Sequence, residues 1–202
     1  MSRALAQLCR GLEALYQTNS GLDPLTLVRP HGGPMGGAQE LLLVRESADG
    51  ALEVALVLDH AVLRDFDADA LADDARLGGA LPVLEGLSHL CYVAEAARQE
   101  RPISGLELET QAEVDKLALT LLSRWERAHK DFDGLVDRLY FRYTLRPMDA
   151  ELTRRYETAN RVALAFSRRL RPLVHARKIS VLRQALREFW RSPMAGKQAL
   201  AA

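Results

Sequence analysis

Cysteine is scarce in this chain of 202 residues, and no cysteine motif is present. The two cysteines, Cys9 and Cys91, lie far apart in the sequence, and no Cys-x-x-Cys pair occurs. Zinc-ribbon sites and thioredoxin-like redox motifs are therefore excluded, because both need closely spaced cysteines. Both residues fall on apolar faces of predicted helices, where a cysteine is usually a buried thiol. We expect two buried, reduced thiols, as in a reducing compartment.

Long apolar runs are also missing. No segment approaches the roughly 18 consecutive apolar residues that a membrane-spanning helix needs. Near the N-terminus, Arg3 and Arg10 interrupt the apolar positions. This pattern predicts an amphipathic helix over residues 2–16 and not a signal peptide. The sequence thus predicts a cytoplasmic protein without a transmembrane segment.

The chain has no net charge, but its charges are distributed unevenly. Residues 1–145 hold 14 Lys and Arg against 23 Asp and Glu, a formal charge of −9, and residues 146–202 hold 13 against 4, or +9. Charge asymmetry of this size is informative even when the total is zero. It indicates either that the two parts dock on each other or that the basic part meets an anionic partner.

Motifs for phosphate and calcium binding are absent or incomplete. The glycine-rich segment 29–38 contains neither a P-loop nor a dinucleotide-binding pattern, so it is interpreted as a loop. Alternating aspartates in 65–74 resemble the start of a calcium loop. However, Ala70 replaces the glycine of the sharp turn and Arg76 replaces the bidentate glutamate. We interpret this segment as a solvated acidic turn.

Two strands are predicted, over residues 40–47 and 52–59, because both are rich in Leu and Val. Asp49-Gly50 between them is a strong hairpin signal. Residues 25–28 are a further short candidate strand. A two-stranded sheet is marginal alone, so we expect helices to cover it. The predicted fold class is α+β, predominantly helical, with a small antiparallel sheet near the N-terminus.

A central helical pair is predicted over residues 82–126. The two helices are separated by a break at Arg101 and Pro102, and Ser104 with Glu107 has capping-box spacing for the second helix. On that helix, Asp115 falls among leucines and should be at least partly buried. A buried carboxylate needs a partner, for which we expect an arginine from the C-terminal third.

The domain prediction follows from these elements. Residues 1–145 form an α+β core, and residues 146–202 form a basic helical segment packed on it. Within that segment, Asp149 is the predicted N-cap of a helix over 150–171, which Pro172 ends, and a second helix covers 180–190. The tail 192–202 has little to pack against and is expected to be flexible.

Arginines recur along the predicted outer faces of these C-terminal helices. Such a basic face, without catalytic motifs, favours a non-enzymatic interaction or regulatory module. We expect it to bind another protein, by heterologous or self-association, or an anion. Nucleic acid is an alternative partner, since phosphates attract clustered arginines, although no nucleic-acid-binding signature is present. The candidate partner-binding residues are Arg154, Arg161, Arg168, Arg183, Arg187 and Arg191.

A second alternative is a metal-dependent enzyme built on the central helices. Carboxylates and histidines that face inward on neighbouring helices form the metal sites of helical bundles, although there the Glu-to-His spacing is three and here it is four. Lys116 would compete for the carboxylates. No cofactor is otherwise implied, and no known family matches position by position. The metal candidates are Glu85, His89, Glu109 and Glu113, and the catalytic candidates are Glu85, His89 and Tyr92.

Overall fold

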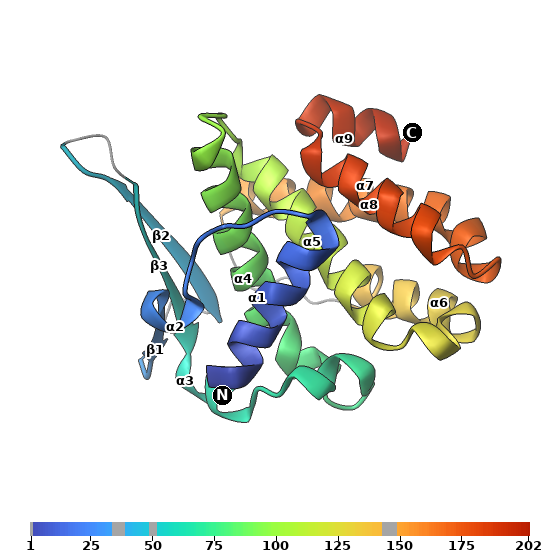
Figure 1. The fold of residues 1–202 in the computed structure, drawn as a ribbon, viewed down its shortest axis with the longest axis horizontal. Coiled ribbons are helices and arrows are strands. Elements are labelled where there is room, and N and C mark those ends of the chain that lie inside the picture. Colours follow the sequence, from blue (N-terminus) through green and yellow to red (C-terminus); the bar gives the residue numbers. More distant parts are fainter. Residues whose placement is uncertain (1, 34–38, 49–51, 143–148) are drawn as a thin grey trace. The chain divides into compact units, whose positions relative to one another are not determined.

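The computed structural model describes the whole chain except residues 1, 34–38, 49–51 and 143–148 (Figure 1). The described part is mostly helical and contains a small three-stranded sheet near the N-terminus. The predicted fold class, α+β and predominantly helical, is therefore confirmed. The tip of the predicted hairpin, Asp49-Gly50, lies outside the described residues.

The chain divides into two compact units. The first comprises Met1–Ala14 and Thr18–Pro102, and the second comprises Leu15–Gln17 and Ile103–Ala202. The division follows Pro102, the turn predicted to separate the two central helices, so each unit contains one helix of that pair. The domain boundary predicted between residues 145 and 146 falls outside the described residues.

The first unit combines the sheet with the N-terminal helices. Its first helix has the bounds that the apolar spacing predicted. A third strand also pairs with the hairpin, after a helical turn that Asp23 caps through the Leu25 N–H. In chain order the elements are α1 (Ser2–Tyr16), α2 (Pro24–Leu27), β1 (Val28–His31), β2 (Glu40–Glu46), β3 (Leu52–Asp59), α3 (His60–Asp65), the 3-10 helix η1 (Ala68–Ala72) and α4 (Leu77–Arg98).

The sheet is mixed, which corrects the prediction of a purely antiparallel one. Strand β3 lies between the other two, with β2 antiparallel on one edge and β1 parallel on the other. Leu56 of β3 is paired with Leu42 of β2 and with Val28 of β1. Hairpin signals specify only the antiparallel edge. Strand β1, of four residues, joins the other edge, and no comparable sequence pattern shows whether such a short strand runs parallel or antiparallel.

Helix α4 covers this sheet and forms the core of the first unit. It contacts β2 and β3, and Leu56, Val83 and Leu87 are fully buried. A Cβ atom at Gly86 would lie 2.6 Å from Leu56 Cδ1, so glycine allows the helix to approach the strand closely. The helix begins at Leu77, before Pro82, and not at residue 82 as predicted. Pro82 is the sixth residue of α4, so its missing N–H removes one backbone hydrogen bond of the helix.

The described residues of the second unit form helices and no strand. Two predicted N-caps are confirmed: the Glu107 N–H donates to Ser104 Oγ at 3.1 Å, and the Leu152 N–H donates to Asp149 Oδ1 at 2.7 Å. Helix α5 packs on α6 and α7, and α7 also contacts α8 and α9. The elements are α5 (Gly105–Ser123), α6 (Trp125–Tyr140), α7 (Ala150–His175), α8 (Ile179–Arg191) and α9 (Met194–Ala201), with the end of α1.

Two expectations about the C-terminus need correction. Pro172 does not end α7, which continues to His175; a proline one turn before the end costs few backbone hydrogen bonds. The residues after Ser192 form α9 and not a flexible tail. The Lys197 side chain is fully buried and anchors this helix through hydrogen bonds, which sequence hydropathy could not show.

Among the described helices, α4 is long and apolar enough to cross a membrane by length and composition. Within the protein, 67% of its most apolar 18-residue window is buried. A core helix passes the same test, so this is weak support for a membrane span.

Candidate functional site

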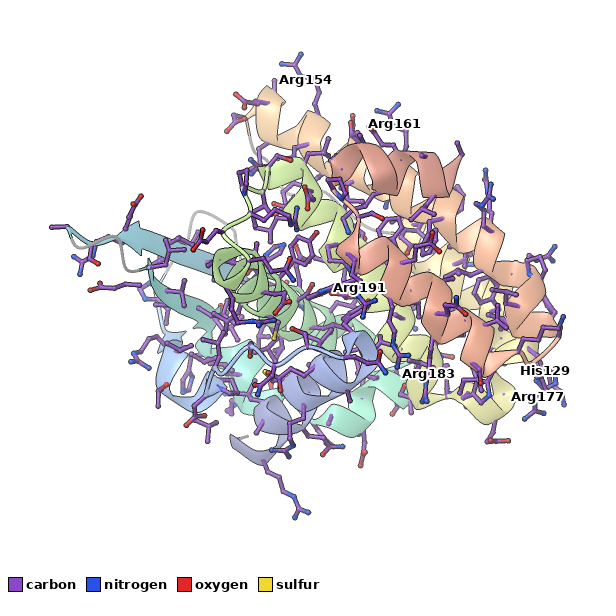
Figure 2. All side chains as sticks on the ribbon, turned by 45° about the horizontal axis from the view of Figure 1, so that its top comes forward. His129, Arg154, Arg161, Arg177, Arg183 and Arg191 are labelled. Atoms are coloured by element: carbon purple, nitrogen blue, oxygen red, sulfur yellow. The ribbon has the colours of Figure 1, made fainter. Side chains whose placement is uncertain are left out.

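The predicted arginines on α7 form a row at the surface. Arg154, Arg161 and Arg168 are exposed and lie seven residues apart, which places them on one side of the helix. Figure 2 shows Arg154 and Arg161 extending away from the ribbon. We call these three residues the α7 arginine row.

Two of the three guanidinium groups of this row donate hydrogen bonds to their own helix. Arg154 Nε donates to the Ala150 carbonyl at 3.1 Å, and Arg161 Nη2 donates to Thr158 Oγ1 at 3.1 Å. Within the part of the chain that the structure describes, no residue of the row forms an ion pair with a carboxylate. Their positive charge is therefore not neutralised locally.

Other arginines of the C-terminal helical segment, Arg155, Arg171 and Arg177, are paired with carboxylates. Arg171 makes a two-pronged contact with Asp133, with distances of 2.8 Å from Nε to Oδ1 and 2.7 Å from Nη2 to Oδ2. This hydrogen bonding lowers the pKa of Asp133. The other two pairs are Arg177 with Glu126 at 2.9 Å and Arg155 with Glu109 at 3.8 Å. Intramolecular ion pairs thus neutralise part of the positive charge of the C-terminal segment. They do not include the α7 arginine row.

The three candidate arginines on α8 are not equivalent. Arg183 and Arg191 are exposed, and both are labelled in Figure 2. Arg187 is half-buried, and its Nε donates to the backbone carbonyl of Leu15 at 2.6 Å. A cation that satisfies a carbonyl at the end of a helix is a structural cap. Arg187 therefore has a described structural role that Arg183 and Arg191 lack.

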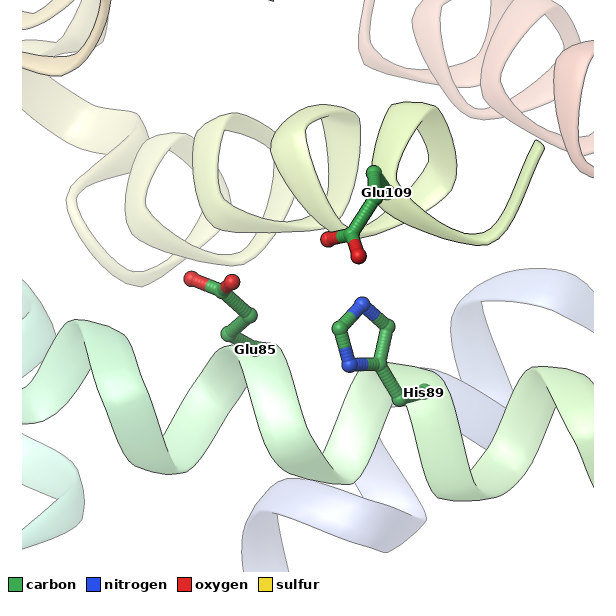
Figure 3. A group of neighbouring side chains, drawn as sticks. All are labelled: Glu85, His89 and Glu109. Atoms are coloured by element: carbon green, nitrogen blue, oxygen red, sulfur yellow. The ribbon is translucent and has the colours of Figure 1, made fainter. Parts of the chain in front are cut away.

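Glu85 and His89 extend from the same side of α4, as their spacing predicted (Figure 3). Glu85 is half-buried and His89 is 3% exposed. His89 Nδ1 lies 3.5 Å from Glu40 Oε1 of β2. The catalytic candidate Tyr92 is also buried, and its hydroxyl accepts a hydrogen bond from Arg101 at 3.0 Å. All these contacts lie within the first unit.

The two remaining metal candidates, Glu109 and Glu113, are on α5 of the second unit. There Glu109 faces Arg155, and Glu113 accepts a hydrogen bond from Lys116 Nζ at 2.6 Å. Lys116 therefore does compete for a candidate ligand, as the sequence indicated. Because the four candidates belong to different units, metal binding by them stays a prediction.

The interior of the second unit contains a hydrogen-bonded chain that we call the Lys197 network. Asp115 is fully buried, as predicted; it accepts hydrogen bonds from the Tyr16 hydroxyl and, at 2.8 Å, from Gln111 Nε2. Gln111 Oε1 in turn accepts from Lys197 Nζ at 2.6 Å. The cation joined to Asp115 through Gln111 is thus a lysine, where we expected an arginine.

Aromatic rings lie beside both ends of this network. Tyr16 stacks on Trp190 with ring centroids 4.1 Å apart. Lys197 Nζ lies 4.5 Å from the centroid of Phe189 and donates to the Phe189 carbonyl at 2.6 Å. Sequence reasoning missed Lys197 because the segment was interpreted as a tail. The signal available was Met194, Lys197 and Ala201 on one helical face.

Tyr140 is a buried phenol of this unit that lies outside the Lys197 network. Its hydroxyl donates to the Glu113 carbonyl at 3.1 Å. Burial raises the pKa of Tyr140 well above its ordinary value, and the nearby negative charges of Glu113 and Asp115 raise it further. The phenol therefore stays protonated at neutral pH and acts as a hydrogen-bond donor.

Comparison of the chain with protein families, with curated proteins and with solved structures finds no match.

Proposed function

We propose that the protein is a binding module that recognises an acidic partner protein through the α7 arginine row. The observation that carries the proposal is the contrast among the arginines of the second unit. Arg155, Arg171 and Arg177 face carboxylates of their own unit, whereas the row has no carboxylate partner among the described residues. An exposed guanidinium is a fork of donors that matches a carboxylate.

The spacing of the row favours a helical partner. Seven residues of α-helix advance about 10.5 Å, so the three arginines extend over about 21 Å along α7. A second helix that carries acidic residues at every seventh position presents carboxylates at the same interval. Charged pairs at this repeat select partners between neighbouring helices in coiled coils. Arg183 and Arg191 on α8 provide further positive charge outside the row.

Binding of a designed acidic probe tests the proposal. The probe is a 21-residue helical peptide, about three heptads long, with glutamate at every seventh position. We expect R154A/R161A/R168A to weaken binding at least about threefold, because each exposed pair contributes roughly 0.2–1 kcal/mol. Raising the salt concentration should weaken wild-type binding, because exposed charges are screened.

The matched control is R155A/R171A/R177A, which removes the same number of positive charges from arginines that are already paired. This variant should retain most of the affinity. Equal losses in the two triple variants would show that only total charge matters and would contradict a specific row. R154K/R161K/R168K adds a test of geometry, since lysine keeps the charge and loses the planar fork.

A DNA duplex with the same formal charge as the acidic peptide tests the alternative that the partner is nucleic acid. The proposal predicts weaker binding to this duplex than to the peptide, because the chain has no recognised nucleic-acid motif and a pI near 7. If the protein bound DNA more tightly than the peptide, and R154A/R161A/R168A lost this binding, the partner would be nucleic acid and not an acidic protein.

A further inference from the structure

The two cysteines of the chain meet inside the first unit. Cys9 lies on α1 and Cys91 on α4, 82 positions apart, and their Sγ atoms are 3.5 Å from each other. Both side chains are buried, with exposed fractions of 2% for Cys9 and 0% for Cys91. The two sulfurs are in hydrogen-bonding contact and are not joined by a disulfide.

The packing of two apolar helix faces produces this contact. Cys9 lies beside Leu5 and Leu12 on the buried side of α1, and Cys91 follows Leu87 on the buried side of α4. A disulfide requires sulfurs about 2 Å apart, so each sulfur must move by less than about 1 Å from its present position. Motion of this size is within reach of small changes in the side-chain torsions.

We propose that Cys9 and Cys91 form an oxidisable pair, in which a peroxide converts the two thiols into a disulfide that fastens α1 to α4. In the first step, the Cys9 thiolate attacks one oxygen of hydrogen peroxide; the oxygen–oxygen bond breaks, and Cys9 sulfenic acid and hydroxide form. In the second step, Cys91 sulfur attacks the Cys9 sulfur and hydroxide leaves, taking up the Cys91 proton as water. Overall, two thiols lose two electrons and two protons, and one peroxide becomes two waters.

Cys9 is the residue expected to react first. The hydrogen bond from Cys91 lowers the pKa of Cys9, with smaller contributions in the same direction from Arg10 and Ser20 against the opposing effects of burial and Glu13. The thiolate is the nucleophilic form of cysteine. Hydrogen peroxide is close to water in size. It can therefore reach a thiol that is 2% exposed more easily than a bulky disulfide reagent can.

Mass spectrometry of the full chain tests this pair. The native protein is treated with hydrogen peroxide, unfolded, and alkylated at its remaining thiols. We expect the intact mass to fall by two hydrogen atoms, both cysteines to escape alkylation, and the Cys9 and Cys91 peptides to appear cross-linked until a reductant is added. The oxidised protein should also melt higher by about 5 °C or more, because the bond closes a long loop in the unfolded chain.

Single-cysteine variants distinguish this chemistry from unselective oxidation. In C91S, Cys9 should accumulate as sulfenic acid, which dimedone present during unfolding traps. Cys91 of C9S should react more slowly. The proposal is overturned if the peroxide-treated wild type keeps two alkylatable thiols, or if its cysteines become sulfinic acids without a cross-link.

Discussion

The second unit contains positive charge in two contrasting regions, the Lys197 network and the α7 arginine row. Lys197 is fully buried and held by Gln111 and two backbone carbonyls. The row is exposed, and Arg154 and Arg161 donate hydrogen bonds to their own helix. A buried cation must keep its partners or destabilise the fold, whereas an exposed one contributes little to stability. The same type of charge therefore stabilises the fold in one region and is available for binding in the other.

Replacing the buried lysine should have the largest effect on stability. We expect Lys197→Met to lower the free energy of unfolding by about 3 kcal/mol or more, because Gln111 loses its charged donor and two carbonyls lose theirs. Denaturant unfolding followed by helical circular dichroism measures the loss. Lys178→Ala, at an exposed lysine in the α7–α8 turn, is the control and should change stability by less than about 0.5 kcal/mol. Equal effects of the two substitutions would remove the contrast between buried and exposed cations.

A double-mutant cycle should show that Lys197 and Asp115 act together. Asp115→Asn alone should cost about 1–3 kcal/mol, since a buried acceptor of two hydrogen bonds loses its charge. The double variant K197M/D115N should be more stable than the sum of the single losses predicts, by about 1 kcal/mol. Strict additivity would mean that Gln111 does not couple the two charges.

Alkaline pH should test the buried phenol of Tyr140. Its pKa is raised in the folded state by burial and by Glu113 and Asp115. Its contribution to stability is therefore fully present below the unfolded pKa of about 10 and is lost as pH rises above that value toward the folded pKa. Tyr140→Phe should weaken this alkaline loss, and should cost about 1 kcal/mol at neutral pH through the hydrogen bond to Glu113. If all five tyrosines titrated together in the folded protein, this assignment would be wrong.

The smallest expected effect concerns a paired arginine at the surface. In Arg171→Ala, the pKa of Asp133 should rise toward its ordinary value, because the hydrogen bond that lowers it is gone. Stability should scarcely change, since both side chains are more than half exposed. NMR titration of the Asp133 carboxyl group measures the shift. An unchanged pKa would show that the pair does not persist in solution.

Local signals in the sequence were sufficient for much of the fold. The N-caps Ser104 and Asp149, the first helix and the antiparallel strand pair all depend on neighbouring residues, and each was predicted. The burial of Asp115 followed from the helical wheel alone. All these features depend on interactions between residues that are close together in the sequence.

Features that depend on distant segments were not predicted. The contact of Cys9 with Cys91 requires knowledge of which helix faces meet, and Lys197 looked like a tail residue because Gln111 lies 86 positions away. The α7 arginine row was visible in the sequence, since its spacing is periodic. The sequence did not show which arginines have carboxylate partners, because partners such as Arg171 and Asp133 are 38 positions apart.

The most direct test compares stability and affinity in the two arginine triple variants. For R154A/R161A/R168A, binding to the acidic helical peptide should fall at least about threefold while the melting temperature stays within about 2 °C of wild type. R155A/R171A/R177A should retain most of its affinity. If the row variant kept its affinity, or if it lost stability as Lys197→Met is expected to do, the arginine row would not be a binding surface.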